Sequence, residues 1–148
     1  MPVPGRLQSL VPWERKKVIE LRLRIKLLNK EPVFYGRRKP SSETNLHLAI
    51  YRERPDVQGI VHTHSLYASV LAVIRKSLPP ILEEMAQVIG GDVRVAPYAP
   101  AGTLELAEVA VKTLGTSAAV FLANHGVLGV GRTLKRSLFS LSDRGERG

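Results

Sequence analysis

The chain has 148 residues, of which 44% are hydrophobic and 24% charged, with 12 glycines, 10 prolines and no cysteine. This is the length of one domain that can bury a core, and the composition is that of a folded chain. Without cysteine, disulfides and thiolate sites are excluded, so a bound metal needs His, Asp or Glu ligands. Since no apolar run approaches the roughly 18 residues of a membrane helix and no secretory signal opens the chain, we expect a cytoplasmic protein.

The net charge of +9 is distributed unevenly. Residues 1–40 hold 11 Lys and Arg against 3 Asp and Glu, residues 41–131 hold 6 against 8, and residues 132–148 hold 5 against 2. A strongly basic protein suggests nucleic acid, but here the basic charge lies in the two flanks. Residues 14–39 have few aromatic side chains and match no nucleic-acid module, so we expect no nucleic-acid partner.

Hydrophobic periodicity and breaker residues predict a mixture of strands and helices. In chain order, we predict a strand at 18–28, a loop at 35–40, a helix at 41–53 and a strand at 59–64. Two helices follow, at 65–74 and 82–88, and then a strand at 93–98 and a helix at 103–114. The last predicted elements are strands at 118–122 and 127–130 and a helix that starts at 133. Ser41 or Ser42, Ser65 and Thr103 are the expected N-caps. Strands and helices do not alternate strictly, which indicates a layered α+β domain.

Two histidines, His62 and His64, lie two residues apart at the end of a predicted strand. Their side chains leave the same face, so two imidazoles can meet one divalent ion. His125, at the end of another apolar strand, is the candidate third ligand, and three neutral nitrogens with an open fourth position suit a catalytic zinc. Taken alone, the His-x-His pair favours a structural interpretation, in which His62 and His64 are ordinary strand residues and His125 is part of a turn. His47 is assigned to structure or to the surface.

Glu43 and the serines before it have an ordinary interpretation as the start of a helix. The carboxylate suits the positive end of the helix dipole, and Ser41 and Ser42 are good caps. A helix N-terminus with serine hydroxyls and free amides is also suited to binding a phosphate. Neither a P-loop nor a dinucleotide fingerprint is present in the sequence, so nucleotide binding has no support.

Four segments in order resemble the class II aldolase/adducin family. They are RKPSSE (38–43), IVHTH (60–64), VAPYAPAGT (95–103) and LANHGVLGVG (122–131). The resemblance implies a three-layer α/β/α fold around a mostly antiparallel sheet, assembled as a homotetramer with active sites at subunit interfaces. We expect the family domain at 36–135, with an atypical basic flank at 1–35 and a short basic tail at 136–148.

The resemblance also implies a site and an activity. Matched by position, His62, His64 and His125 are zinc ligands, Glu43 is the catalytic acid/base, and Ser41 and Ser42 are part of the pocket for a substrate phosphate. The implied activity is that of a zinc-dependent aldolase, a carbon–carbon lyase that cleaves a small phosphorylated ketose such as fuculose 1-phosphate. The metal stabilises the enediolate formed in this cleavage.

The flanks depart from the family pattern. Two upstream phosphate-binding elements, Gly-Asn-x-Ser and Thr-x-Ser-Gly, are not found in residues 1–40, and a short basic tail replaces the usual C-terminal helix. Glu83 aligns with a tyrosine of the fuculose-phosphate enzymes. We hypothesise a shifted reading frame, which translation of the encoding DNA in all frames tests. The alternatives are a sugar-phosphate epimerase or dehydratase, and an inactive adducin-like or damaged domain.

Overall fold

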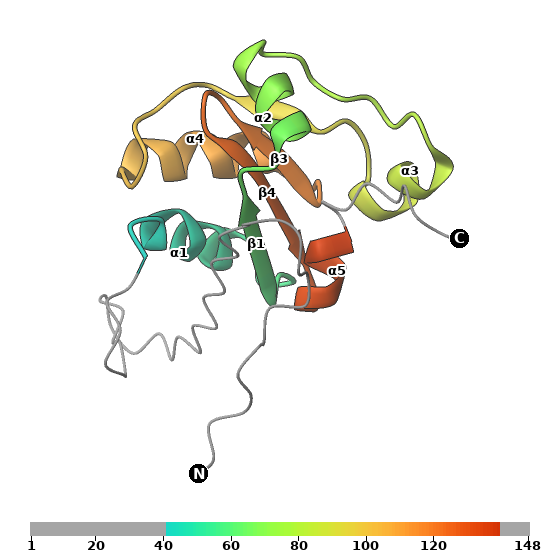
Figure 1. Ribbon diagram of the computed structural model, residues 1–148. Helices are drawn as coiled ribbons and strands as arrows, with labels where there is room; N and C mark the ends of the chain where they lie inside the picture. Colours follow the sequence, from blue (N-terminus) through green and yellow to red (C-terminus); the bar gives the residue numbers. More distant parts are fainter. Residues whose placement is uncertain (1–40, 140–148) are drawn as a thin grey trace, which may run out of the picture.

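The computed structural model describes residues 41–139, which form the helices and strands of Figure 1. The strand predicted at 18–28 and the loop at 35–40 lie outside these residues. In chain order the elements are α1 (Thr44–Glu53), β1 (Gly59–Thr63), α2 (Leu66–Val73), α3 (Glu83–Ile89), β2 (Arg94–Ala96), α4 (Leu104–Leu114), β3 (Ala119–Leu122), β4 (Gly126–Gly131) and α5 (Leu134–Phe139). The elements predicted for residues 41–139 are therefore present, with small shifts at their ends.

The start of α1 differs from the prediction. Its N-cap residue is Glu43, not Ser41 or Ser42. The reason is a tight turn before the helix, in which the Ser41 carbonyl accepts a hydrogen bond from the Thr44 amide at 3.1 Å, and the Ser41 hydroxyl accepts one from the Glu43 amide at 3.2 Å. The prediction for α4 is confirmed, because the Thr103 hydroxyl accepts a hydrogen bond from the amide of the third helical residue.

The four strands form one sheet in the order β1-β4-β3-β2. The β1–β4 and β3–β4 pairs are antiparallel and the β2–β3 pair is parallel, so the predicted, mostly antiparallel sheet is confirmed. In the β1–β4 register, Thr63 lies opposite Val127. The end of β1 therefore lies beside the start of β4, and each of these points adjoins a histidine in the sequence.

Helices cover both faces of the sheet, as the alternation of side chains in β3 requires. Val120 and Leu122 pack into a core cluster with residues of α1 and α4. Ala119 and Phe121 pack into a second cluster with residues of α2 and α3. Figure 1 shows the sheet between these two groups of helices. The expected three-layer α/β/α arrangement is therefore confirmed.

Helix α5 packs at the end of the sheet far from the histidines. The hydroxyl of the buried Ser137 donates to the carbonyl of Gly59, the first residue of β1, at 2.8 Å. At the end of β4, a Cβ on Gly131 would lie 3.0 Å from the Arg136 Cβ, so glycine allows α5 to approach closely. Across residues 41–139 we find no helix with the length and apolar character needed to cross a membrane.

Candidate metal centre

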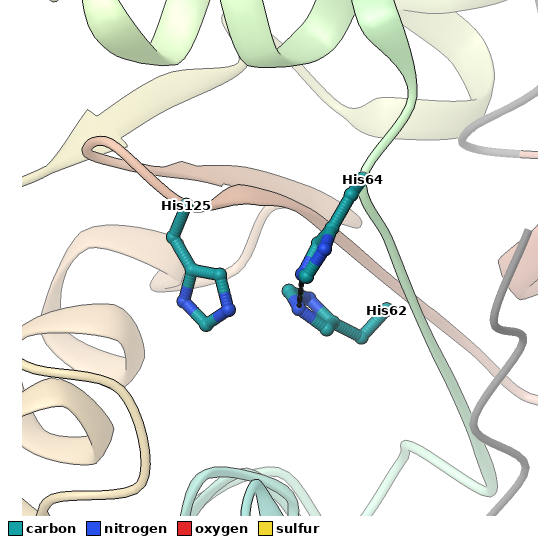
Figure 2. A group of neighbouring side chains, drawn as sticks. All are labelled: His62, His64 and His125. Carbon is teal, nitrogen blue, oxygen red and sulfur yellow. Dashed lines mark hydrogen bonds between the residues drawn. The ribbon is translucent and has the colours of Figure 1, made fainter.

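Three histidines meet at one end of the sheet (Figure 2). His62 belongs to β1, His64 follows the end of that strand, and His125 lies in the turn between β3 and β4. The Nε2 atoms of His62 and His64 are 2.9 Å apart, and one nitrogen from each ring lies within 4.8 Å of the others. Three nitrogens on one tetrahedral zinc lie about 3.3 Å apart, so small ring rotations suffice to hold an ion.

Local backbone conformation brings His125 to this place. The amide of His125 donates to the Leu122 carbonyl at 3.0 Å, which closes a tight turn, and Asn124 within the turn has a φ of +56°. Asparagine tolerates this left-handed conformation better than most residues do. At Gly126, a Cβ would lie 2.5 Å from the Thr63 carbonyl oxygen and 2.8 Å from the Cδ2 of His64. Only glycine therefore allows the turn to lie this close to the end of β1.

The environment keeps two of the three imidazoles, those of His62 and His125, neutral. The pKa of His62 is lowered to about 3, mainly by burial and to a lesser extent by the neighbouring His125 and His64. Burial also lowers the pKa of His125. A metal binds the neutral form of histidine, so no proton has to be displaced from these two rings near neutral pH.

The predicted acid/base residue lies beside the histidines. Glu43 is 5% exposed at the N-cap of α1. Burial raises the pKa of its carboxyl, while the charge of His64 and the backbone amide of Gly102 act in the opposite direction. The two serines precede it at the same end of the helix, Ser41 half-buried and Ser42 exposed. The structure thus brings Glu43 and the three histidines together, with the serines adjacent.

Buried polar atoms without a hydrogen-bond partner gather in this region of the structure. Within residues 41–139 they are the Glu43 Oε2, both ring nitrogens of His47, and the Nδ1 atoms of His62 and His125. Such atoms are rare in folded proteins, and a cluster of them indicates a site built to receive a ligand. With three imidazole nitrogens close together and no thiolate available, the donor set fits zinc.

His47 is fully buried and does not lie on the surface. It lies one helical turn after Glu43 in α1, on the same helix face, and it interacts electrostatically with His62. Of the two expectations for His47, a structural role or a surface position, only the structural role fits its burial. The roles of Asn124 and Gly126 were missed, although the order Asn-His-Gly at a strand end was the available signal.

The crowding at Gly126 predicts that Gly126→Ala displaces the end of β1 and His64. We expect a loss of about 1–3 kcal/mol in the free energy of unfolding and weaker zinc binding, because the nearest atom is an immobile carbonyl. Gly90→Ala is the matched control, since its φ of +83° strains an alanine but nothing lies within 4 Å of the new Cβ. It should lower stability without changing zinc affinity. Equal zinc affinity in both variants would contradict the prediction.

Buried His47 predicts acid sensitivity of the metal-free fold. Burial lowers its pKa from 6.5 to about 4 in the folded state, so only the unfolded chain takes up this proton between these values. The contribution of neutral His47 to the free energy of unfolding is complete above pH 6.5 and is lost on acidification towards pH 4. The loss between pH 7 and pH 5 is about 2 kcal/mol. Measured by urea unfolding, the loss in the free energy of unfolding between pH 7 and pH 5 should be smaller by this amount in His47→Leu than in the wild type. An unchanged pH dependence would show that His47 is not responsible.

Comparisons with known proteins agree with this geometry. Residues 14–142 match the family model of the class II aldolase and adducin N-terminal domain. The chain is 40% identical over 114 residues to the 5-methylthioribulose-1-phosphate/5-deoxyribulose-1-phosphate aldolase of Rhodospirillum rubrum, covering 77% of this chain and 52% of that protein. It is 43% identical over 103 residues to the 5-deoxy-D-ribulose 1-phosphate aldolase of Bacillus thuringiensis serovar kurstaki, covering 70% of this chain and 48% of that protein.

Among solved structures, the fold resembles an L-fuculose 1-phosphate aldolase with a TM-score of 0.69 and 44% identity, over 73% of this chain and 50% of that one. The chain therefore spans about half the length of the curated relatives that it matches. The match to the family model extends over most of the chain and includes the three histidines and Glu43. This chain belongs to the class II aldolase and adducin N-terminal domain family.

Proposed function

We propose that this chain is a zinc-dependent aldolase that cleaves a small phosphorylated ketose. The observation that carries the proposal is the convergence of three histidine nitrogens, with the buried carboxyl of Glu43 close enough to interact electrostatically with His64, in a chain of this family. The relatives it matches are named as aldolases of 5-deoxyribulose 1-phosphate and of fuculose 1-phosphate. Both substrates are ketoses phosphorylated at C1, so we propose this class for the present chain.

The reaction sets the requirements for the site. Cleavage of a 2-ketose 1-phosphate breaks the C3–C4 bond, the C4 hydroxyl loses its proton, and the electron pair remains on C3 until that carbon is protonated. The products are dihydroxyacetone phosphate and an aldehyde. Zinc held by His62, His64 and His125 would supply a Lewis acid for the negative charge that develops on the substrate oxygens. The chain's remaining task is to move one proton and to hold the phosphate.

Glu43 is the proposed acid/base. Its carboxyl lies at the N-cap of α1 with Oε2 buried and unpartnered, so one oxygen remains available to the substrate. Burial raises its pKa, which brings the carboxyl closer to the range in which it can both accept and return a proton. His64 lies near enough to affect the charge of this carboxyl. The proton-transfer group and the proposed metal ligands thus share one site.

The start of α1 is the proposed seat of the substrate phosphate. The Ser41 oxygen accepts a hydrogen bond from the Glu43 amide, which leaves its hydroxyl proton for an acceptor. Ser42 is exposed beside it, at the N-terminal end of a ten-residue helix whose dipole favours an anion. A phosphate held here would place the ketose next to Glu43.

We also propose that the chain forms a homo-oligomer through α2. This helix begins two residues after His64. Together with its C-cap residue Ile74, it exposes a row of apolar side chains at 49–80% of their full exposure: Leu66, Tyr67, Val70, Val73 and Ile74. A helix that is apolar on all sides is normally buried, and large exposed apolar patches mark interaction sites. A second copy covering this face would lie beside the metal centre, in keeping with the tetramer that the family resemblance implies.

The activity is tested by loading the purified chain with zinc, removing unbound metal, and measuring dihydroxyacetone phosphate release from the three ketose phosphates. The three substrates are 5-methylthioribulose 1-phosphate, 5-deoxyribulose 1-phosphate and fuculose 1-phosphate, after the named relatives. We expect about one zinc per chain and cleavage of at least one of them. His62→Ala should lose both. Glu43→Gln should keep the zinc and lower kcat by about 10²–10⁴-fold, because only proton transfer is removed. Full activity in Glu43→Gln would contradict its role, and folded wild-type chain without zinc would contradict the whole proposal.

The oligomer is tested by sedimentation of wild type and Val70→Glu. A carboxylate in the middle of a buried apolar interface is strongly unfavourable, so the variant should sediment as a monomer. Gln58→Glu adds the same charge at an exposed site outside α2 and should leave the oligomer intact. A monomeric wild type, or a Val70→Glu variant that stays associated, would contradict this interface.

A further inference from the structure

Two non-glycine residues in the described chain have a positive φ, Arg75 at +58° and Asn124 at +56°. This left-handed conformation is unfavourable for most residues and persists where surrounding contacts impose it. The two residues are 49 positions apart in the sequence, yet they contact each other. The Arg75 Nη1 donates a hydrogen bond to the Asn124 Oδ1 at 2.7 Å.

The same guanidinium nitrogen also binds the end of α2. Nη1 of Arg75 lies 2.9 Å from the carbonyl oxygens of Ala72 and Val73, in the last turn of that helix. These carbonyls lack helical partners, and a cation is favourable at this end of a helix. Arg75 therefore joins the C-terminus of α2 to the turn that contains Asn124.

Helix α2 is thereby connected to both segments that carry the histidines. Its first residue comes two positions after His64, and its C-terminal end reaches the turn that ends in His125. Ala72, on the inner face of α2, packs in one cluster with Phe121 and Val127, which flank this turn on either side. The position of the turn is thus set by the packing of its flanking residues against Ala72 and by the hydrogen bond from the Arg75 side chain.

His125 needs such support more than His62 does. His62 is 2% exposed within β1, so the core holds its ring, whereas His125 is only half-buried. The backbone angles of Asn124 set the direction in which the next residue leaves the chain. A hydrogen bond to the Asn124 side chain restrains those angles, and hence the direction of His125.

We propose that Arg75 and Asn124 are positioning residues, whose hydrogen bond holds the 122–126 turn in the conformation that directs His125 towards His62 and His64. The inference rests on the proposed function for its consequence, which is tighter metal binding. Neither residue belongs to the proposed ligand set, and in this proposal both act through His125. Partners beyond the ligands of a metal site typically contribute about 10–100-fold in affinity. Because this bond is exposed, the lower end of that range is expected.

The experiment compares zinc affinity, by chelator competition, in wild type, Arg75→Asn, Asn124→Gly and the double variant. Asparagine and glycine both accept a left-handed backbone, so each change removes the bond with little added strain. Each single variant should bind zinc about 10-fold more weakly. The double variant should lose no more than either, since the two residues act through one bond. Lys76→Gln, which removes the neighbouring exposed cation, should bind as wild type, and Arg75→Lys should recover part of the loss.

Hydrogen exchange of the metal-free proteins gives a second readout that needs no zinc. Backbone amides in 122–126 should exchange faster in Arg75→Asn and Asn124→Gly, while those of 127–130 stay protected. Unchanged exchange in the turn, unchanged zinc affinity in the single variants, or additive losses in the double variant would overturn the proposal. A wild-type chain that binds no zinc would instead contradict the proposed function, and the exchange rates would still decide whether this bond holds the turn.

Discussion

The antiparallel pairing of β1 with β4 is the constraint on which the candidate site depends. With Thr63 opposite Val127, the last residues of β1 lie beside the first residues of β4, and the histidines at these two points come together. The close approach is possible because Gly126 has no side chain to meet the Thr63 carbonyl. Two side chains from one strand end and one from the facing turn can then meet a single ion from one side.

Burial makes this arrangement both suitable for a metal and costly without one. Desolvation keeps His62 and His125 neutral, which is the form a metal requires, and it raises the pKa of Glu43. The same burial leaves polar atoms of Glu43, His62 and His125 unpartnered. A metal that binds only the folded chain stabilises it, so we expect zinc binding and stability to be coupled.

Much of the fold and the site could be predicted from the sequence because the signals were local. Short apolar runs located β1 and β3, Thr103 marked the start of α4, and the His-x-His spacing placed two rings on one face. His125 was a candidate third ligand from its place at another strand end, whereas the role of Glu43 came only from the family resemblance, because a lone acid at a helix start has an ordinary structural interpretation. The structure brings the three histidines together and places Glu43 close enough to interact electrostatically with His64.

The rest could not be predicted because it depends on contacts between distant segments. The bond between Arg75 and Asn124 joins two residues that each look like ordinary loop residues in the sequence. The Ser41 turn shifted the start of α1 by a competition between local hydrogen bonds that composition does not reveal. The exposed apolar face of α2 likewise appears only once the packing of the helix on the sheet is known.

The central claim is that three histidines of this chain hold one metal ion, and X-ray absorption at the zinc edge of the zinc-loaded protein tests it most directly. We predict three imidazole nitrogens at about 2.0–2.1 Å, completed by oxygen ligands. The same spectrum of His125→Ala should lose one imidazole. A wild-type spectrum with one imidazole or none, or one unchanged in His125→Ala, would contradict the account.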